Sequence, residues 1–209
     1  MVRTDDGGGG TPPDSIADVV ARMAAIEAAL PPGDGVACFD RMYLQVTELV
    51  RDRIGAGYFA DPDAMTALDV TFAELFLAAV DAADAGQRVP RAWAPLFARR
   101  AAPRVLAVQF AIAGMNAHIN HDLPIAVVTT CEQRGLVPAA IHDDYLRVNA
   151  LLGSIEQQVR QSFEDEVVRT VDRDLSPVLD LLGNWSIDKA REAAWVNADV
   201  LWRLRDVAV

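Results

Sequence analysis

The sequence predicts an all-α protein, a single compact multi-helix bundle around one central buried helix. Apolar residues recur at three- and four-residue intervals along most of the 209 residues, which is the spacing of one helix face. No stretch alternates apolar and polar residues as a half-buried strand does, and no Asn-Gly hairpin turn occurs. We expect one domain over residues 14–209, preceded by a flexible glycine-rich leader over residues 1–13.

Three helices are expected in the first half. The first runs to about Leu30, with Asp14 or Ser15 as its N-cap, because such side chains accept hydrogen bonds from the first free backbone amides. The second covers residues 36–54. The third covers residues 62–85 and begins with a proline, which the first turn of a helix tolerates well.

The second half begins with a short segment at residues 90–100, and the central helix is expected to start at Pro103. Pro124 falls inside its apolar run and removes the hydrogen bond to the carbonyl of Asn120, so we expect a kink or break there. Three more helices are expected: one from about residue 142 to 168, a shorter one between Pro177 and Gly183, and a last one at residues 189–207.

Charge and composition exclude several classes of function. The net charge of −11 and the absence of a basic stripe argue against nucleic acid and against anionic membranes as partners. The start of the chain lacks an apolar signal segment. The one apolar run that approaches the length of a membrane span, Val105 to Ile119, leads directly into polar residues that hydrocarbon would not tolerate. We therefore expect a cytoplasmic protein with its two cysteines reduced; its oligomeric state stays open.

The candidate site lies in the central helix, where two of the three histidines of the chain fall close to an aspartate. His121 follows His118 by three residues and Asp122 follows it by four. On a helix, the three side chains therefore lie within about one third of the circumference. Burying these polar groups is costly unless each finds a partner or a ligand. We therefore predict a functional site here. A buried polar network that only fixes the helix packing is the competing interpretation.

Imidazoles with a carboxylate are typical ligands of a divalent metal, and the candidate donors for iron or zinc are His118, His121, Asp122 and Asp69. Three ligands from one helical turn seldom converge, so we expect His118 and Asp122 to point together and His121 to serve as a supporting group or a separate acid or base. Further candidates from other helices are Asp40, Asp144 and His142.

Asp69 lies within a helix and has no capping role, whereas Asp143 and Asp144 are expected at the start of one, where they would cap its amides. The catalytic candidates are His118, His121, Asp122, Asp69 and Asp144.

We expect an enzyme that acts on a small apolar molecule, such as an intermediate of secondary metabolism, with or without a metal. Without a metal, a histidine oriented by an aspartate would act as general acid or base in an isomerase, lyase or cyclase. The same residues are compatible with a non-catalytic binding or scaffold protein whose polar network is structural. A magnesium-dependent isoprenoid-type cyclase is also compatible with them but less favoured.

Several strings of residues resemble a protein family. They are Leu68-Asp69 with Phe72-Ala73, Ala92-Trp93, the string Met115-Asn116-Ala117-His118-Ile119-Asn120-His121-Asp122-Leu123-Pro124, and Asp144-Tyr145 with Val148-Asn149. From Phe39 onward the chain resembles a family of mostly actinobacterial proteins that carries only a domain-of-unknown-function label. The resemblance implies a compact helical domain and supplies no activity.

Overall fold

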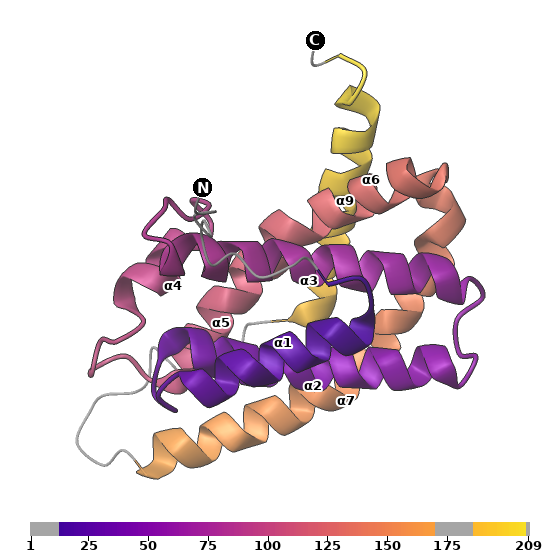
Figure 1. Cartoon of the computed structure of the whole chain (residues 1–209). Coiled ribbons are helices and arrows are strands. Elements are labelled where there is room, and N and C mark those ends of the chain that lie inside the picture. Colours follow the sequence, from indigo (N-terminus) through magenta and orange to yellow (C-terminus); the bar gives the residue numbers. More distant parts are fainter. Residues whose placement is uncertain (1–12, 170–185, 208–209) are drawn as a thin grey trace, which may run out of the picture.

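The computed structural model describes residues 13–169 and 186–207, without the side chains of residues 154–169. Within this part of the chain all regular structure is helical and no strand occurs, which confirms the all-α prediction (Figure 1). The elements are α1 (Ile16–Ala29), α2 (Gly35–Gly55), α3 (Pro62–Asp84), α4 (Ala94–Arg99), α5 (Ala107–Ala117), η1 (His118–Asp122), α6 (Leu123–Arg134), α7 (Pro138–Arg169) and α9 (Ile187–Leu204).

Polar N-caps fix where α1 and α3 begin. The backbone N–H of Asp18 donates to the hydroxyl of Ser15 at 3.2 Å, so Ser15 caps α1. The carboxylate of Asp61 accepts from the N–H of Ala64, and Pro62 follows it in the first turn of α3. Each cap satisfies an amide that has no partner within its helix. The predicted starts of α1 and α3 are therefore confirmed.

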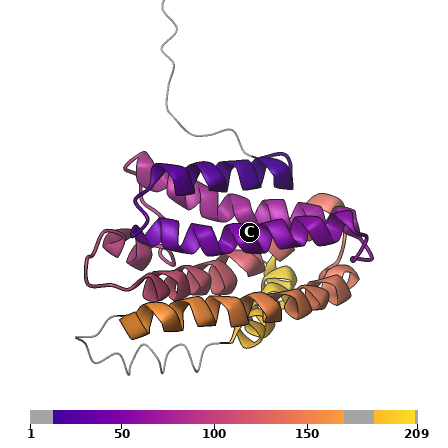
Figure 2. The ribbon, with the colours of Figure 1, turned by 90° about the horizontal axis from the view of Figure 1, so that it is seen from below.

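The central helix predicted from the sequence is present as α5, η1 and α6. In Figures 1 and 2 the long helices α2 and α3 lie next to each other, with α1 packed on one side of them. α5 packs against α2 on the other side, while α6 packs against α3 and α9. The C-terminal end of α9 projects from the bundle in Figure 1. The central element is thus enclosed by helices from both halves of the chain.

The expected interruption of this helix takes the form of a π-helical turn. The N–H of Leu123 donates to the carbonyl of His118, five residues earlier, directly before Pro124. Turns of this kind often occur at functional sites, because the wider turn changes how side chains project. The expected start at Pro103 was wrong. α5 begins at Ala107, where Gln109 accepts a hydrogen bond from the N–H of Leu106 and so takes up one free amide of the first turn.

Gly114 lets the central helix approach α2 closely. A Cβ atom at this position would overlap the ring of Phe39, which is 1% exposed. The contact places His118, one turn later on the central helix, among the aromatic side chains of α2 and α3. The small residue therefore positions the candidate site and is not only a packing detail.

α7 starts earlier than expected. It begins at Pro138 and not near residue 142, because this proline occupies the first turn and needs no backbone partner there. Asp143 and Asp144 therefore lie inside α7 and do not cap its start, which corrects the expected capping role. Most of the predicted leader and the short helix between Pro177 and Gly183 lie outside the described residues. No helix in the described ranges is long and apolar enough to cross a membrane.

Candidate functional site

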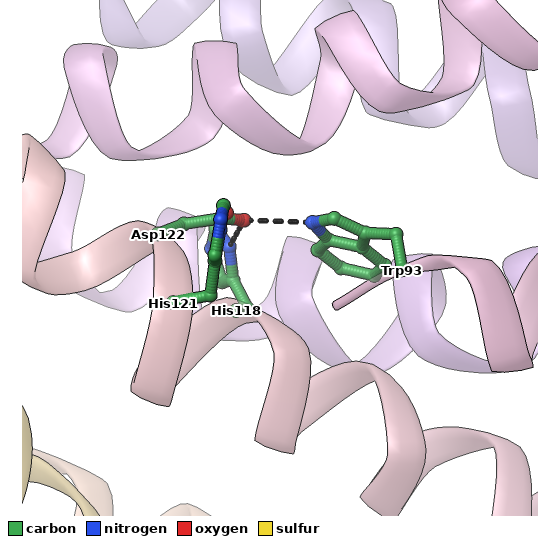
Figure 3. A network of polar contacts seen from close by, with 4 residues as sticks. All are labelled: Trp93, His118, His121 and Asp122. Carbon is green, nitrogen blue, oxygen red and sulfur yellow. Dashed lines mark hydrogen bonds and ion pairs between the residues drawn. The ribbon is translucent and has the colours of Figure 1, made fainter. Parts of the chain in front are cut away.

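Asp122 is the centre of a buried polar network (Figure 3). The residue is 1% exposed, and its two oxygens accept hydrogen bonds from three other side chains. Oδ2 accepts from the indole N–H of Trp93 at 2.9 Å and lies 3.0 Å from Nδ1 of His118. Oδ1 lies 2.6 Å from Nδ1 of His121. These donors compensate the cost of burying a carboxylate.

His118 is held in one orientation by Asp122 and by aromatic rings. Because a carboxylate can only accept, Nδ1 of His118 carries the proton in this contact. Phe72 stacks on the imidazole with ring centroids 3.5 Å apart, and Tyr43 meets it edge-on at 4.4 Å. Burial lowers the pKa of His118, while the hydrogen bond and charge of Asp122 oppose that shift. Nε2 is buried and has no hydrogen-bond partner among the described residues.

The imidazole of His118 lines a cavity of about 90 Å³ between α2, α3, the central helix, α7 and α9. The wall is mostly aliphatic and aromatic, with Asp69, Tyr43 and Arg191 as the other polar lining residues. The apolar lining residues are Phe39, Met42, Val46, Val50, Met65, Leu68, Phe72, Met115, Ile119, Val148, Leu152 and Ile187. A largely apolar pocket with a few convergent polar groups is typical of sites for small molecules.

Asp69 is the carboxyl group of this cavity. It lies on α3, one turn before Phe72, and is 9% exposed. Its Oδ2 has no hydrogen-bond partner in the described part of the chain. Burial raises the pKa of Asp69 to about 7, because the apolar walls disfavour the charged form. Asp69 can therefore hold or release a proton near neutral pH.

His121 contacts the other oxygen of the same Asp122 carboxylate (Figure 3). Its side chain is 42% exposed and borders a surface depression with Asn116 and Asn120. None of the residues around that depression lines the cavity of His118. His118 and Asp122 thus point together, as expected, while His121 contacts the same carboxylate without lining the cavity.

The remaining candidates from other helices lie elsewhere. Asp144 accepts from the backbone N–H groups of Ala60 and Asp61 at 2.9 and 2.7 Å, and it is not among the residues that line the cavity. Asp40 is fully buried on α2 and also does not line the cavity. His142 packs its ring 4.4 Å from that of Trp195.

Metal-binding groups require at least three suitable donors close together. Across residues 13–153 and 186–207, no three His, Cys, Asp or Glu side chains lie so that they could hold a metal ion. The predicted donors His118, His121, Asp122 and Asp69 therefore do not form such a group here. Both oxygens of Asp122 also accept hydrogen bonds from N–H groups. A carboxylate bonded in this way typically orients a neighbouring histidine.

Two members of the site were not predicted from the sequence. Trp93 has the pattern of an ordinary core residue, and it is fully buried, yet its N–H fixes Asp122. Arg191 lines the cavity from α9 although it is only 5% exposed. The sequence does contain a signal for Arg191. It lies one turn before Ala194 and Trp195, so it is a charged residue on the apolar face of the last helix.

The chain belongs to a family of unknown function, DUF5995, whose pattern matches residues 16–208. This confirms the resemblance at the level of a family without an assigned activity. Comparisons with curated proteins and with solved structures found no match.

Proposed function

We propose that this member of DUF5995 is an enzyme that transfers protons on a small apolar molecule, with His118 as general base and Asp69 as general acid. The observation that carries the proposal is the state of His118: Nδ1 is held by Asp122, and the buried Nε2 has no partner among the described residues while the ring lines a cavity. The reactions that fit are isomerisation, elimination or cyclisation. A metal is not needed for any of them.

His118 has the properties of a base that is ready to act. With the proton on Nδ1, the lone pair is on Nε2, which is the nitrogen left for a substrate. The lowered pKa keeps the ring neutral at neutral pH. When Nε2 takes a proton, the carboxylate of Asp122 stabilises the resulting imidazolium, as in other histidine–aspartate pairs.

Asp69 is the proposed general acid, the proton donor that complements the base His118. Its pKa of about 7 leaves a large fraction of the carboxyl protonated near neutrality, so it can donate a proton to an oxygen or carbon of the bound molecule. Two titratable groups whose surroundings push them toward opposite roles are typical of acid–base sites. Both line one cavity, so one small molecule can contact both.

Trp93 and His121 act through Asp122 as positioning residues. Each places an N–H against a carboxylate oxygen, which holds the plane of Asp122 and therefore the ring of His118. His121 is partly exposed and does not line the cavity.

A probe reaction tests the base without knowledge of the natural substrate. A nitro-substituted benzisoxazole loses its ring C–H proton to a base as its N–O bond breaks, giving a nitrile and a coloured phenolate. We expect the protein to accelerate this elimination and the variant His118→Asn to lose the effect by about 10²- to 10⁴-fold. Asparagine keeps an N–H near the position of Nδ1, so the contact with Asp122 is retained while the base is removed.

The matched control is His142→Asn, which removes an imidazole outside the cavity and should leave the rate unchanged. Equal rates for His118→Asn and the native protein would overturn the proposal. If the native protein gives no acceleration and His118→Asn instead lowers the free energy of unfolding by about 1–3 kcal/mol, the polar network is structural.

A further inference from the structure

We propose that Arg191 binds the carboxylate of the substrate, so that the cavity accepts a small apolar carboxylic acid as its monoanion. This inference rests on the proposed function and names the class of molecule brought to His118.

Arg191 is anchored by neutral groups on one side of its guanidinium. Nε donates to Oδ1 of Asn149 at 2.5 Å, and Nη2 donates to the backbone carbonyl of Tyr145 at 3.0 Å. The guanidinium carbon lies 4.1 Å from the centroid of the Tyr145 ring, and the hydroxyl of Tyr145 donates to the carbonyl of Arg191. These contacts, all with α7, hold the planar cation rigidly against that helix.

The guanidinium forms no ion pair with a described carboxylate within salt-bridge distance. The hydrogen bonds that Arg191 makes to described side chains and carbonyls come from Nε and Nη2, and the described carboxylate that acts on the cation through its charge is Asp188, three residues earlier on α9. Burial lowers the pKa of Arg191, with Tyr145 and Asp188 opposing the shift. An arginine does not give up its proton in a protein, so the cation persists and its burial is costly without an anion. The cavity that Arg191 lines is the place from which such an anion can reach it.

The charge of the walls selects a monoanion. Arg191 is the only lysine or arginine among the described lining residues, and Asp69 adds a group that becomes negative as the pH rises. A phosphate or diphosphate would bring more negative charge than one guanidinium offsets. A carboxylate matches the geometry of a guanidinium and needs no second cation.

The apolar walls define the rest of the molecule. Met42, Val46 and Leu152 are among the aliphatic side chains that line the cavity together with Arg191 and His118. A carboxylate at Arg191 would leave the body of the acid against these side chains. His118 and Asp69 then meet a carbon away from the carboxylate, which is where a proton would be removed or added.

Hexanoate and hexan-1-ol, which have the same chain length, serve as the probes. Affinities are measured by calorimetry for the native chain, for Arg191→Met and for Arg203→Met, the matched control on the exposed side of α9. We expect the native protein to bind hexanoate at least about tenfold more tightly than the alcohol. Arg191→Met should abolish this preference, because methionine keeps much of the side-chain length without the charge, and Arg203→Met should retain it.

A second measurement serves if Arg191→Met fails to fold. The nitrogen resonance of the Arg191 Nε group in the native protein should shift when hexanoate is added and not when hexan-1-ol is added. Equal affinities for acid and alcohol, no binding of hexanoate, or an acid preference that survives in Arg191→Met would each overturn the assignment of Arg191.

His118→Asn separates this inference from the proposed function. If His118→Asn still prefers hexanoate while the probe elimination is independent of His118, only the catalytic proposal fails. If the elimination requires His118 and the native protein shows no preference for the acid, only the assignment of Arg191 fails.

Discussion

Nδ1 of His118 and Oδ2 of Asp122 lie 3.0 Å apart in a site where both side chains are almost fully buried. This contact sets which nitrogen of the imidazole bears the proton, and so which one is free to act. Because Trp93 donates to the same oxygen, the carboxylate cannot turn away from His118 without losing a second hydrogen bond. The orientation of the imidazole is thus set in part by Asp122 and Trp93, which do not line the cavity themselves.

Replacing Asp122 by asparagine should reduce turnover of the benzisoxazole probe by about 10³-fold or more while the fold is kept. The amide has the shape of the carboxylate, but it lacks the negative charge that stabilises protonated His118. Nitrogen NMR of the three histidines reports the tautomer of His118. This tautomer should not change if Asp122 has only a structural role. In the native protein His118 should be the Nδ1–H tautomer, and in Asp122→Asn this preference should weaken. An unchanged tautomer together with an unchanged rate would contradict the positioning role.

The pH profile of the probe elimination should be bell-shaped. Burial lowers the pKa of His118 from its usual 6.5, so the base is already free at weakly acidic pH, and the rate should reach its plateau below that value. Asp69 ionises at about pH 7, and above it a negative charge in the cavity opposes the phenolate that forms. The rate should therefore fall as the pH rises through about 7.

Asp69→Asn is the control for the alkaline limb of that profile. The amide resembles the protonated carboxyl and cannot ionise, so the fall above neutral pH should disappear while the acidic limb stays. An alkaline limb that persists in Asp69→Asn would show that another group causes it.

Asp144→Ala should lower stability without affecting the probe reaction of the folded protein. The carboxylate accepts from the N–H groups of Ala60 and Asp61 and from Arg147 at 2.9 Å, and it joins α7 to the loop before α3. Its loss leaves these donors without their acceptor, and we expect a cost of about 2 kcal/mol in urea denaturation. The exposed neighbour Asp143 is the matched control, because Asp143→Ala should change the free energy of unfolding by less than about 0.5 kcal/mol. A loss of probe activity in folded Asp144→Ala would contradict this assignment.

Local signals in the sequence are sufficient to predict most of the fold. Ser15 and Pro62 mark helix starts by local chemistry, and the i, i+4 spacing of His118 and Asp122 predicts their contact. Trp93 lies 29 residues before Asp122, and Asp144 lies more than 80 residues after the amides that it binds. Such pairs depend on how helices pack, which periodicity within one helix does not specify. Two parts of the resemblance stay predictions: that the string from Met115 to Pro124 marks the family, and that the family is mostly actinobacterial.

Asp40 should make the protein less stable as the pH rises from weakly acidic to weakly alkaline. The side chain is fully buried, and both oxygens lack hydrogen-bond partners in the described part of the chain. Burial raises the pKa of Asp40 from 3.8 to about 8; the charge of Glu27 adds to the shift and that of Arg41 opposes it. The folded state therefore binds a proton that the unfolded state has released between these two values. The sign of the linkage is thus negative: the free energy of unfolding falls with pH across this window.

Asp40→Asn removes this titration and keeps a side chain of nearly the same shape. At about pH 5 the carboxyl is protonated in the folded state but already ionised in the unfolded state, so the variant should be somewhat more stable than the native protein. Between about pH 5 and about pH 8 this advantage of the variant should grow by about 2–4 kcal/mol. Urea denaturation of both proteins at the two pH values measures the difference, and comparing the pair cancels the contributions of Asp69 and His118. A difference between the two proteins that is the same at both pH values would show that Asp40 is already ionised in the folded state and has a partner. A difference that grows with pH would instead establish a buried neutral carboxyl on α2 outside the cavity that His118 lines.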